Sequence, residues 1–174
     1  MFPFRSAPSL ALLVLLLSAA FAAADDPRAL RWRELIPAAL ADEPVGPPAV
    51  DHTNPDVLTQ LSPWGDLPMS ELVVPELDGA DVTIAGFVVP LNLTEDNRVD
   101  EFLLVPYYGA CVHVPPPPPN QVIYVTAEEG EGLAAERIYD AWEVRGRLTV
   151  AARQSAMAQA GYSLRADELT LYGY

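Results

Sequence analysis

The single cysteine of the chain, Cys111, lies two residues before His113, one of only two histidines. In an extended segment, residues two apart point to the same side, so we expect the thiol and the imidazole to project together. Thiolate and imidazole are both ligands for zinc and copper, and together they are also a candidate nucleophile and base. The surrounding sequence, YYGACVHVPPPPPNQ, therefore predicts a loop whose residue types allow chemistry.

Five prolines, residues 115–119, follow this pair. Proline fixes φ near −65°, so the run predicts a stiff polyproline II rod on the order of 15 Å long. We expect the rod to hold the preceding residues in place, with two side-chain amides where the next strand begins. The candidate residues of a ligand- or partner-binding loop are Tyr107, Tyr108, Gly109, Pro115, Pro116, Pro117, Pro118, Asn120 and Gln121.

Three interpretations of the loop stay open. The first is a metal site, with zinc as the expected ion, in which Cys111 and His113 are ligands and His52 is a distant third candidate. The second is a thiol-dependent enzyme with Cys111 as nucleophile and His113 as base. The third is a purely structural loop or interaction module. An accessible thiol is exposed to oxidation outside the cytoplasm, which argues against the enzyme.

The N-terminus has the pattern of a cleaved signal peptide over residues 1–24. Arg5 precedes an uncharged apolar stretch, Leu10 to Ala24, that ends in small residues and is followed by two aspartates. The stretch is shorter than the ~20 residues that span a bilayer, so we expect no stable membrane insertion after cleavage. The sequence predicts an exported protein, and one cysteine excludes an internal disulfide.

The composition is strongly acidic. Ten Arg and no Lys stand against 24 Asp and Glu, which gives a formal net charge of −14. Such a surface repels phosphate backbones and anionic lipid headgroups. We therefore expect no nucleic-acid partner, and instead a cation, a neutral ligand or a basic protein surface.

The remaining chain divides into an N-terminal part, 25–79, and a β domain, 80–174. Residues 26–37 predict a short helix with Trp32 on its apolar side, and seven prolines between 41 and 79 predict an extended arm. Residues 153–161 predict a second short helix. Sheet patterns occur in five segments, 81–91, 99–107, 120–127, 141–150 and 161–174.

The five predicted strands are short, and the first and the fourth each contain a glycine, which favours a strongly curved sheet. We expect the first strand to bend at Gly86. In the last strand the inward-facing pattern shifts by one residue, which predicts a β-bulge around 166–168. The predicted fold is mainly β, a small five-stranded OB-like barrel with a Pro-rich N-terminal arm and a short N-terminal helix. A β-sandwich is the alternative.

The segments GFVVPL (residues 86–91) and EFLLVPYYGACVHVPPPPPNQ (residues 101–121) resemble a family of bacterial secreted proteins known as domain of unknown function 3299. The resemblance extends from WRELIP (residues 32–37) to YSLRADEL (residues 162–169). The resemblance implies a periplasmic protein of a Gram-negative bacterium. Members of the family are often encoded beside ABC-transporter components, some of them in zinc-responsive clusters. The residues that match the family's hallmark are Cys111, His113, Pro115 to Pro118, Asn120 and Gln121.

From these patterns we expect a periplasmic accessory or binding protein that is associated with an ABC-type transport system and binds zinc through the Cys-x-His loop. The resemblance implies transporter components or other periplasmic proteins as partners. The chain has no acylated cysteine near the N-terminus, unlike lipid-anchored members, so we expect it to be soluble.

Overall fold

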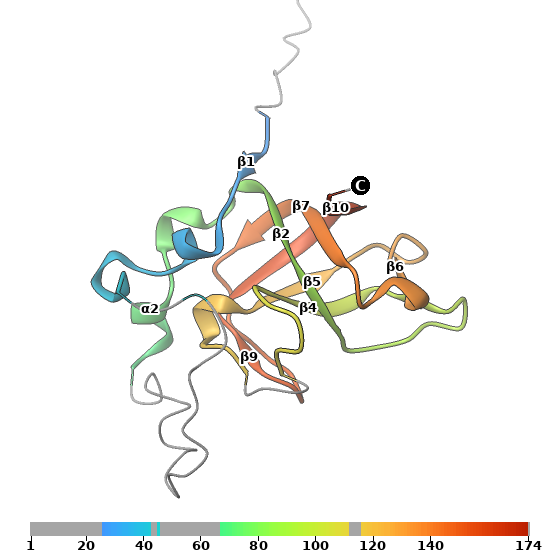
Figure 1. Cartoon of the computed structure of the whole chain (residues 1–174). Coiled ribbons are helices and arrows are strands. Elements are labelled where there is room, and N and C mark those ends of the chain that lie inside the picture. The colour runs from blue at the N-terminus through green and yellow to red at the C-terminus, as the bar shows by residue number, and fades with distance from the viewer. Residues whose placement is uncertain (1–25, 43–44, 46–66, 112–115, 174) are drawn as a thin grey trace, which may run out of the picture.

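The computed structural model describes residues 26–42, 45, 67–111 and 116–173 (Figure 1). The expected signal peptide therefore lies outside the described residues. The same holds for both histidines, His52 and His113, and for Pro115.

Five long strands close into a barrel. Each neighbour in the order β2-β4-β5-β10-β7 is hydrogen-bonded to the next, and β7 pairs back to β2. All of these pairs are antiparallel except β5 with β10. This five-stranded closed sheet confirms the predicted OB-like barrel over the alternative sandwich. The strands are β2 (Asp81–Pro90), β4 (Glu101–Val105), β5 (Ile123–Thr126), β7 (Ala141–Thr149) and β10 (Tyr162–Leu171).

Strand β2 changes partners in its middle, and Gly86 allows the bend. The strand pairs with β7 up to Phe87 and with β4 from Phe87 onward. A Cβ atom on Gly86 would lie 2.7 Å from the carbonyl oxygen of Val105 and 3.0 Å from a ring carbon of Trp32. The predicted β-bulge is also confirmed, because the β10–β7 register shifts between Ala166 and Glu168.

The segment 153–161 forms a hairpin, so the helix predicted there is wrong. Two short strands, β8 (Arg153–Gln154) and β9 (Gln159–Ala160), pair antiparallel. The Ser155 hydroxyl accepts hydrogen bonds from the backbone N–H groups of Met157 and Ala158, which stabilises a turn. Burial of Ala158 and Ala160 against the barrel outweighs the helix preference of the alanines.

Two further short strands, β3 (Arg98–Val99) and β6 (Leu133–Ala134), pair with each other beside the barrel. A 3-10 turn, Ala135–Arg137, leads from β6 toward β7.

The N-terminal segment joins the sheet before it turns across the barrel. Strand β1 (Arg28–Ala29) runs parallel to β2. The helix expected over 26–37 is wrong at its start, where β1 lies, and only a 3-10 turn, Trp32–Leu35, is helical; a second turn, Ala38–Leu40, follows. The Trp32 indole N–H donates a hydrogen bond of 2.7 Å to the carbonyl oxygen of Ala85, which fixes the first turn next to the bend of β2.

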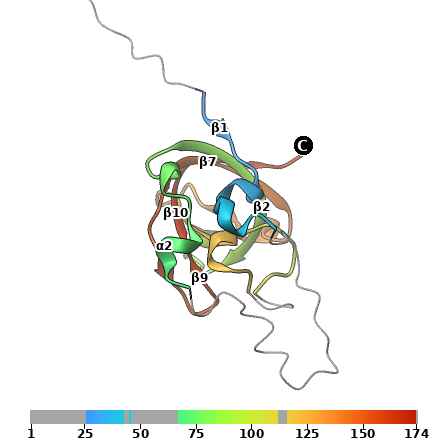
Figure 2. The same ribbon diagram turned by 90° about the vertical axis from the view of Figure 1, so that its left-hand side faces the viewer.

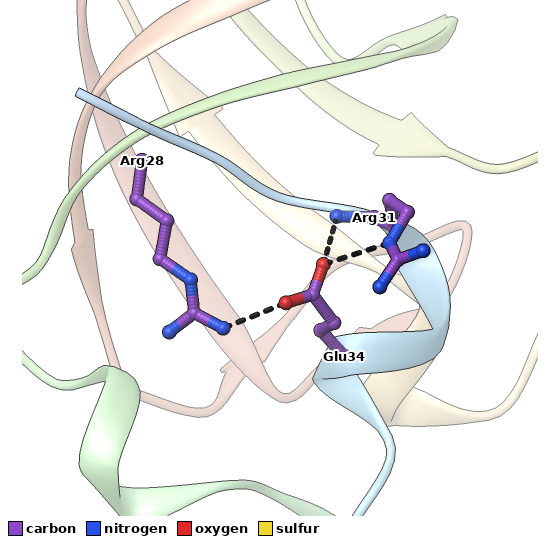
Figure 3. A network of polar contacts seen from close by, with 3 residues as sticks. All are labelled: Arg28, Arg31 and Glu34. Carbon is purple, nitrogen blue, oxygen red and sulfur yellow. Dashed lines mark hydrogen bonds and ion pairs between the residues drawn. The ribbon is translucent and has the colours of Figure 1, made fainter. Parts of the chain in front are cut away.

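Glu34 stabilises the N-terminal segment through contacts with Arg28 and Arg31 (Figure 3). Its carboxylate accepts a hydrogen bond from the Arg31 backbone N–H at 2.9 Å and forms ion pairs with Arg28 at 2.7 Å and with Arg31 at 3.2 Å. The Arg31 N–H, followed by the Arg28 guanidinium, lowers the pKa of Glu34 to about 2. The carboxylate is therefore ionised at any physiological pH.

In the arm predicted for 41–79, residues 43–44 and 46–66 lie outside those described, and the described part 67–79 packs on the barrel but is folded, not extended. It contains a short helix, α2 (Met69–Leu72), and a 3-10 turn, Pro75–Leu77. Leu72 and Leu77 are 3% and 2% exposed. Figure 2 shows α2 and the N-terminal turns gathered at one end of the barrel.

The principal core fills the barrel, with inward side chains from all five strands joined by Leu35, Val73 and Leu77 from the covering segments. On β7, Trp142, Val144, Gly146 and Leu148 are buried and alternate with exposed or half-buried residues, as predicted. Within the described residues, no helix is long and apolar enough to cross a membrane.

Candidate functional site

The cysteine loop joins β4 to β5, and its described residues 107–111 lie on the outside of the barrel. Outward side chains of β2, β4 and the start of β5 form a second apolar cluster, and three loop residues, Tyr107, Ala110 and Cys111, pack on it. The hairpin β8–β9 covers it from the other side through Ala158 and Ala160. In OB-fold barrels the face of the second and third strands, here β4 and β5, binds oligonucleotides. In this chain its own loop and hairpin cover that face.

Cys111 is half-buried and its backbone is strained. Its φ of 63° lies in the left-handed region, which is uncommon for a residue other than glycine. Burial raises the pKa of the thiol to about 11. A thiol with this pKa is almost fully protonated at neutral pH, whereas a nucleophilic cysteine has a lowered pKa. The environment of Cys111 therefore argues against the thiol-dependent enzyme.

Tyr107 lies close to this thiol. Burial, followed by the charge that Cys111 acquires on ionisation, raises the pKa of Tyr107 to about 12. The phenol oxygen is buried and has no hydrogen-bond partner among the described residues. Both groups are thus neutral at physiological pH, and neither provides a base for the other.

The proline run is extended only in part. Pro118 has the polyproline II conformation, with φ −59° and ψ 154°, but Pro119 begins a 3-10 turn, Pro119–Gln121. Pro116 is exposed, and Pro117 is buried. The predicted five-residue rod is therefore wrong at its C-terminal end.

The two amides after the prolines point into the protein. Asn120 and Gln121 lie just before β5, where we expected the two amides, and each is 1% exposed. The Gln121 side-chain N–H donates to the carbonyl oxygen of Trp32 at 3.1 Å and ties the loop to the N-terminal turn. Neither amide atom of Asn120 has a hydrogen-bond partner among the described residues.

The metal interpretation depends on residues beyond those described. Only Cys111 of the three expected ligands is described, since His113 and His52 are not. Within the described ranges, no group of three or more His, Cys, Asp or Glu residues is placed to hold a metal ion. This part of the chain therefore supplies one zinc ligand, fewer than the four that a closed structural site requires.

An apolar groove lies beside the loop. It has a volume of ≈ 190 Å³ and is lined by the loop residues 108–110, the second half of β2 and the segment before β7. The Tyr108 ring packs edge-on against Phe87, with centroids 5.9 Å apart. Tyr108 and Tyr139 are 56% and 69% exposed although they line an apolar hollow. Of the predicted loop residues, Tyr108 and Gly109 thus line this groove.

Neither Tyr139 nor Phe87 is among the candidate residues of the sequence analysis. Phe87 is half-buried and lies on the outward side of β2. Tyr139 follows the turn Ala135–Arg137, far from the loop in sequence, and no local pattern distinguishes it.

Comparison with known proteins gives the following matches. The family model described as "Protein of unknown function (DUF3299)" matches residues 32–171. The crystal structure of a DUF3299 family protein from Pseudomonas aeruginosa PAO1 is similar, with 39% sequence identity and a TM-score of 0.70. That match covers 86% of this chain and 98% of the other. No curated protein matches.

Proposed function

This chain belongs to the DUF3299 family of proteins of unknown function, and we propose that it is a non-enzymatic accessory protein of the periplasm. In this proposal it binds a basic protein surface, that of a component of an ABC-type transport system, through the cysteine loop and the groove beside it. The periplasmic location follows from the signal-peptide pattern, and the transport association from the family resemblance.

The groove is the observation that carries the proposal. Exposed aromatic side chains that line an apolar hollow are typical of protein interfaces, where tyrosine is enriched among the residues that dominate affinity. Tyr108 and Tyr139 fit this description, and Phe87 supports Tyr108 from below.

Charge supports a basic partner. The chain has a formal net charge of −14, so approach of a positively charged surface is favoured and that of nucleic acid is disfavoured. The loop and hairpin that cover β4 and β5 also occupy the face on which related barrels bind oligonucleotides.

The test uses a photo-crosslinking amino acid at position 108, followed by identification of the adduct. We expect an adduct with a transport-system component, and we expect its binding to the purified chain to weaken roughly tenfold or more in Tyr108→Ser and Tyr139→Ser. The matched control is Tyr172→Ser, since Tyr172 is also 56% exposed but does not line the groove. Equal loss in the control, or binding that does not weaken with salt, would contradict the proposal.

Zinc binding is a second proposal, supported by the unpaired thiol of Cys111 two residues before His113. A bound cation would stabilise the thiolate that burial disfavours. Native mass spectrometry of untagged protein tests it, and we expect one zinc ion that is lost in both Cys111→Ser and His113→Ala. Retention of the metal by both variants would exclude these ligands while leaving the groove proposal intact.

A further inference from the structure

A second hollow, of ≈ 300 Å³, lies on the outer wall of the barrel across β5, β10 and β7. It shares no lining residue with the groove beside the loop. Three of the ten arginines of the chain line it, together with three Ser or Thr residues, and none of its lining residues is acidic. The arginines are Arg147, Arg153 and Arg165, and the Ser and Thr residues are Thr126, Thr149 and Ser163.

The sheet register places two of these arginines directly opposite each other. Arg165 of β10 pairs with Arg147 of β7, and both side chains are more than half exposed on the same outer face. Like charges directly opposite in an antiparallel pair destabilise a sheet. Thr126 stands beside Arg165 on the adjacent strand β5 and continues the same row. A bound anion would offset the repulsion.

Arg153 adds a third cation from the hairpin. Its guanidinium carbon lies 5.9 Å from the centroid of the Tyr124 ring, within the range of a cation–π interaction. The Tyr124 hydroxyl donates to Glu101 at 3.1 Å, which fixes the ring. Arg153 forms no ion pair with any carboxylate in the described part of the chain. Its charge is therefore held in place without an acidic partner.

The other two arginines each form an ion pair with one nearby carboxylate. Arg147 contacts Asp81 at 2.9 Å and Arg165 contacts Asp167 at 3.8 Å, and all four side chains are more than half exposed. Exposed pairs of this kind are weak and exchange readily. Each guanidinium has five N–H donors, so most donors remain free for a ligand.

We propose that this hollow binds a phosphate group, either as inorganic phosphate or as a small phosphate monoester. A tetrahedral dianion offers acceptor oxygens in several directions, which suits three guanidinium groups from three strands, whereas a carboxylate is satisfied by one guanidinium fork. The Thr126 hydroxyl forms no hydrogen bond within the described residues and can donate as well. The hydroxyls of Thr149 and Ser163 already donate to backbone carbonyls.

The test is a titration of the folded protein with inorganic phosphate, glycerol phosphate or succinate, followed by NMR at the arginine Nε–H and backbone signals. We expect saturable shifts confined to the lining residues with one or both phosphate compounds, and much weaker shifts with succinate. The two phosphate arms distinguish a free anion from a monoester. Arg153→Gln and Arg165→Gln should each weaken phosphate binding roughly tenfold, the loss of one charge-assisted contact.

The matched control is Arg145→Gln. Arg145 lies on β7, is 50% exposed and pairs with Glu168, but it does not line the hollow, so this variant should retain full affinity. Arg165→Lys keeps the charge without the fork and should also lose most of the affinity. Thermal unfolding verifies that each variant is folded. Non-saturable shifts, equal binding of succinate, or an equal loss in the control would each overturn the proposal.

Discussion

The hydroxyl of Tyr162 donates a hydrogen bond of 2.8 Å to the carbonyl oxygen of Leu35. The Tyr162 hydroxyl oxygen in turn accepts a hydrogen bond of 2.7 Å from the backbone N–H of Val74. Tyr162 is fully buried at the start of β10. One side chain of the barrel therefore satisfies backbone groups of two separate covering segments and holds both of them against the core.

Tyr162→Phe should lower the free energy of unfolding by about 1–3 kcal/mol, because it leaves a buried N–H and a buried carbonyl without partners. Urea denaturation measures the change. Tyr172→Phe is the control, since Tyr172 is exposed and its hydroxyl has no such role. An unchanged midpoint in Tyr162→Phe would mean that the two segments are held by apolar contacts alone.

Stability should fall at alkaline pH. Burial raises the pKa of Cys111 from 9.0 to about 11 and that of Tyr162 from 10.0 to about 12. The unfolded chain releases these protons first, so the stabilisation is complete below about pH 9 and is lost as the pH rises through 11–12. Urea midpoints between pH 8 and pH 11 test this, and Tyr162→Phe should show a shallower decline. A flat profile in the wild type would contradict the burial of both groups.

At acidic pH the relevant group is Glu34. Its pKa of about 2 in the folded state lies below the ordinary 4.5, so its stabilisation is present above pH 4.5 and is lost as the pH falls through 2. Its partners Arg28 and Arg31 are 55% and 86% exposed, which limits the effect through solvent screening. We expect Glu34→Gln to lower the free energy of unfolding at pH 7 by about 1 kcal/mol or less, and to bring the value at pH 3 closer to that of the wild type. Glu129→Gln, in an exposed turn, is the control.

Gly86→Ala should destabilise the barrel by about 1–3 kcal/mol, the range for overpacking of a filled site. Backbone surrounds this position, because the new Cβ would lie 2.7 Å from the Val105 carbonyl oxygen, and a carbonyl within a strand pair cannot rotate away. Thermal unfolding measures the loss. The near-UV signal of Trp32 should change as well, since its ring lies 3.0 Å from the same point. A variant as stable as the wild type would show that β2 bends elsewhere.

The thiol of Cys111 should react slowly. With a pKa of about 11 instead of 9.0, its thiolate fraction at pH 8 falls roughly a hundredfold, and labelling by a disulfide reagent should slow in proportion. The control is the same protein in denaturant, where labelling should be fast. Rapid labelling of the folded protein with an apparent pKa below 9 would reinstate the thiol-dependent enzyme.

The barrel could be predicted from the sequence because several of its strands, β7 above all, carry a period-2 pattern. Inward residues of β7 alternate without interruption, and the phase change in β10 located the bulge between Ala166 and Glu168. Gly86 could be assigned to a bend because a glycine in the middle of an apolar strand marks a bend or a close backbone approach. The contacts that a Cβ atom would make there agree with this. These features depend on residues next to one another in sequence.

The features that could not be predicted depend on contacts between distant segments. The alanines of 153–161 favour a helix locally, but Ala158 and Ala160 are buried against the outer face of the barrel and impose a hairpin. Asn120 is a polar residue at the end of a proline run, yet it is 1% exposed. The groove combines Tyr108 and Tyr139 from separate loops, and no spacing rule links them. Of the proposed zinc ligands, only Cys111 lies within the described residues.

The position of β10 between β5 and β7 has a consequence for folding. All earlier strands can pair among themselves during synthesis, yet two sheet edges stay unpaired until β10 inserts, and unpaired edges promote aggregation. The barrel therefore cannot close on a nascent chain whose last strand is still inside the ribosome. Maturation of this protein has to begin after its C-terminal strand is released, and a truncation before Tyr162 should give an open, aggregating sheet.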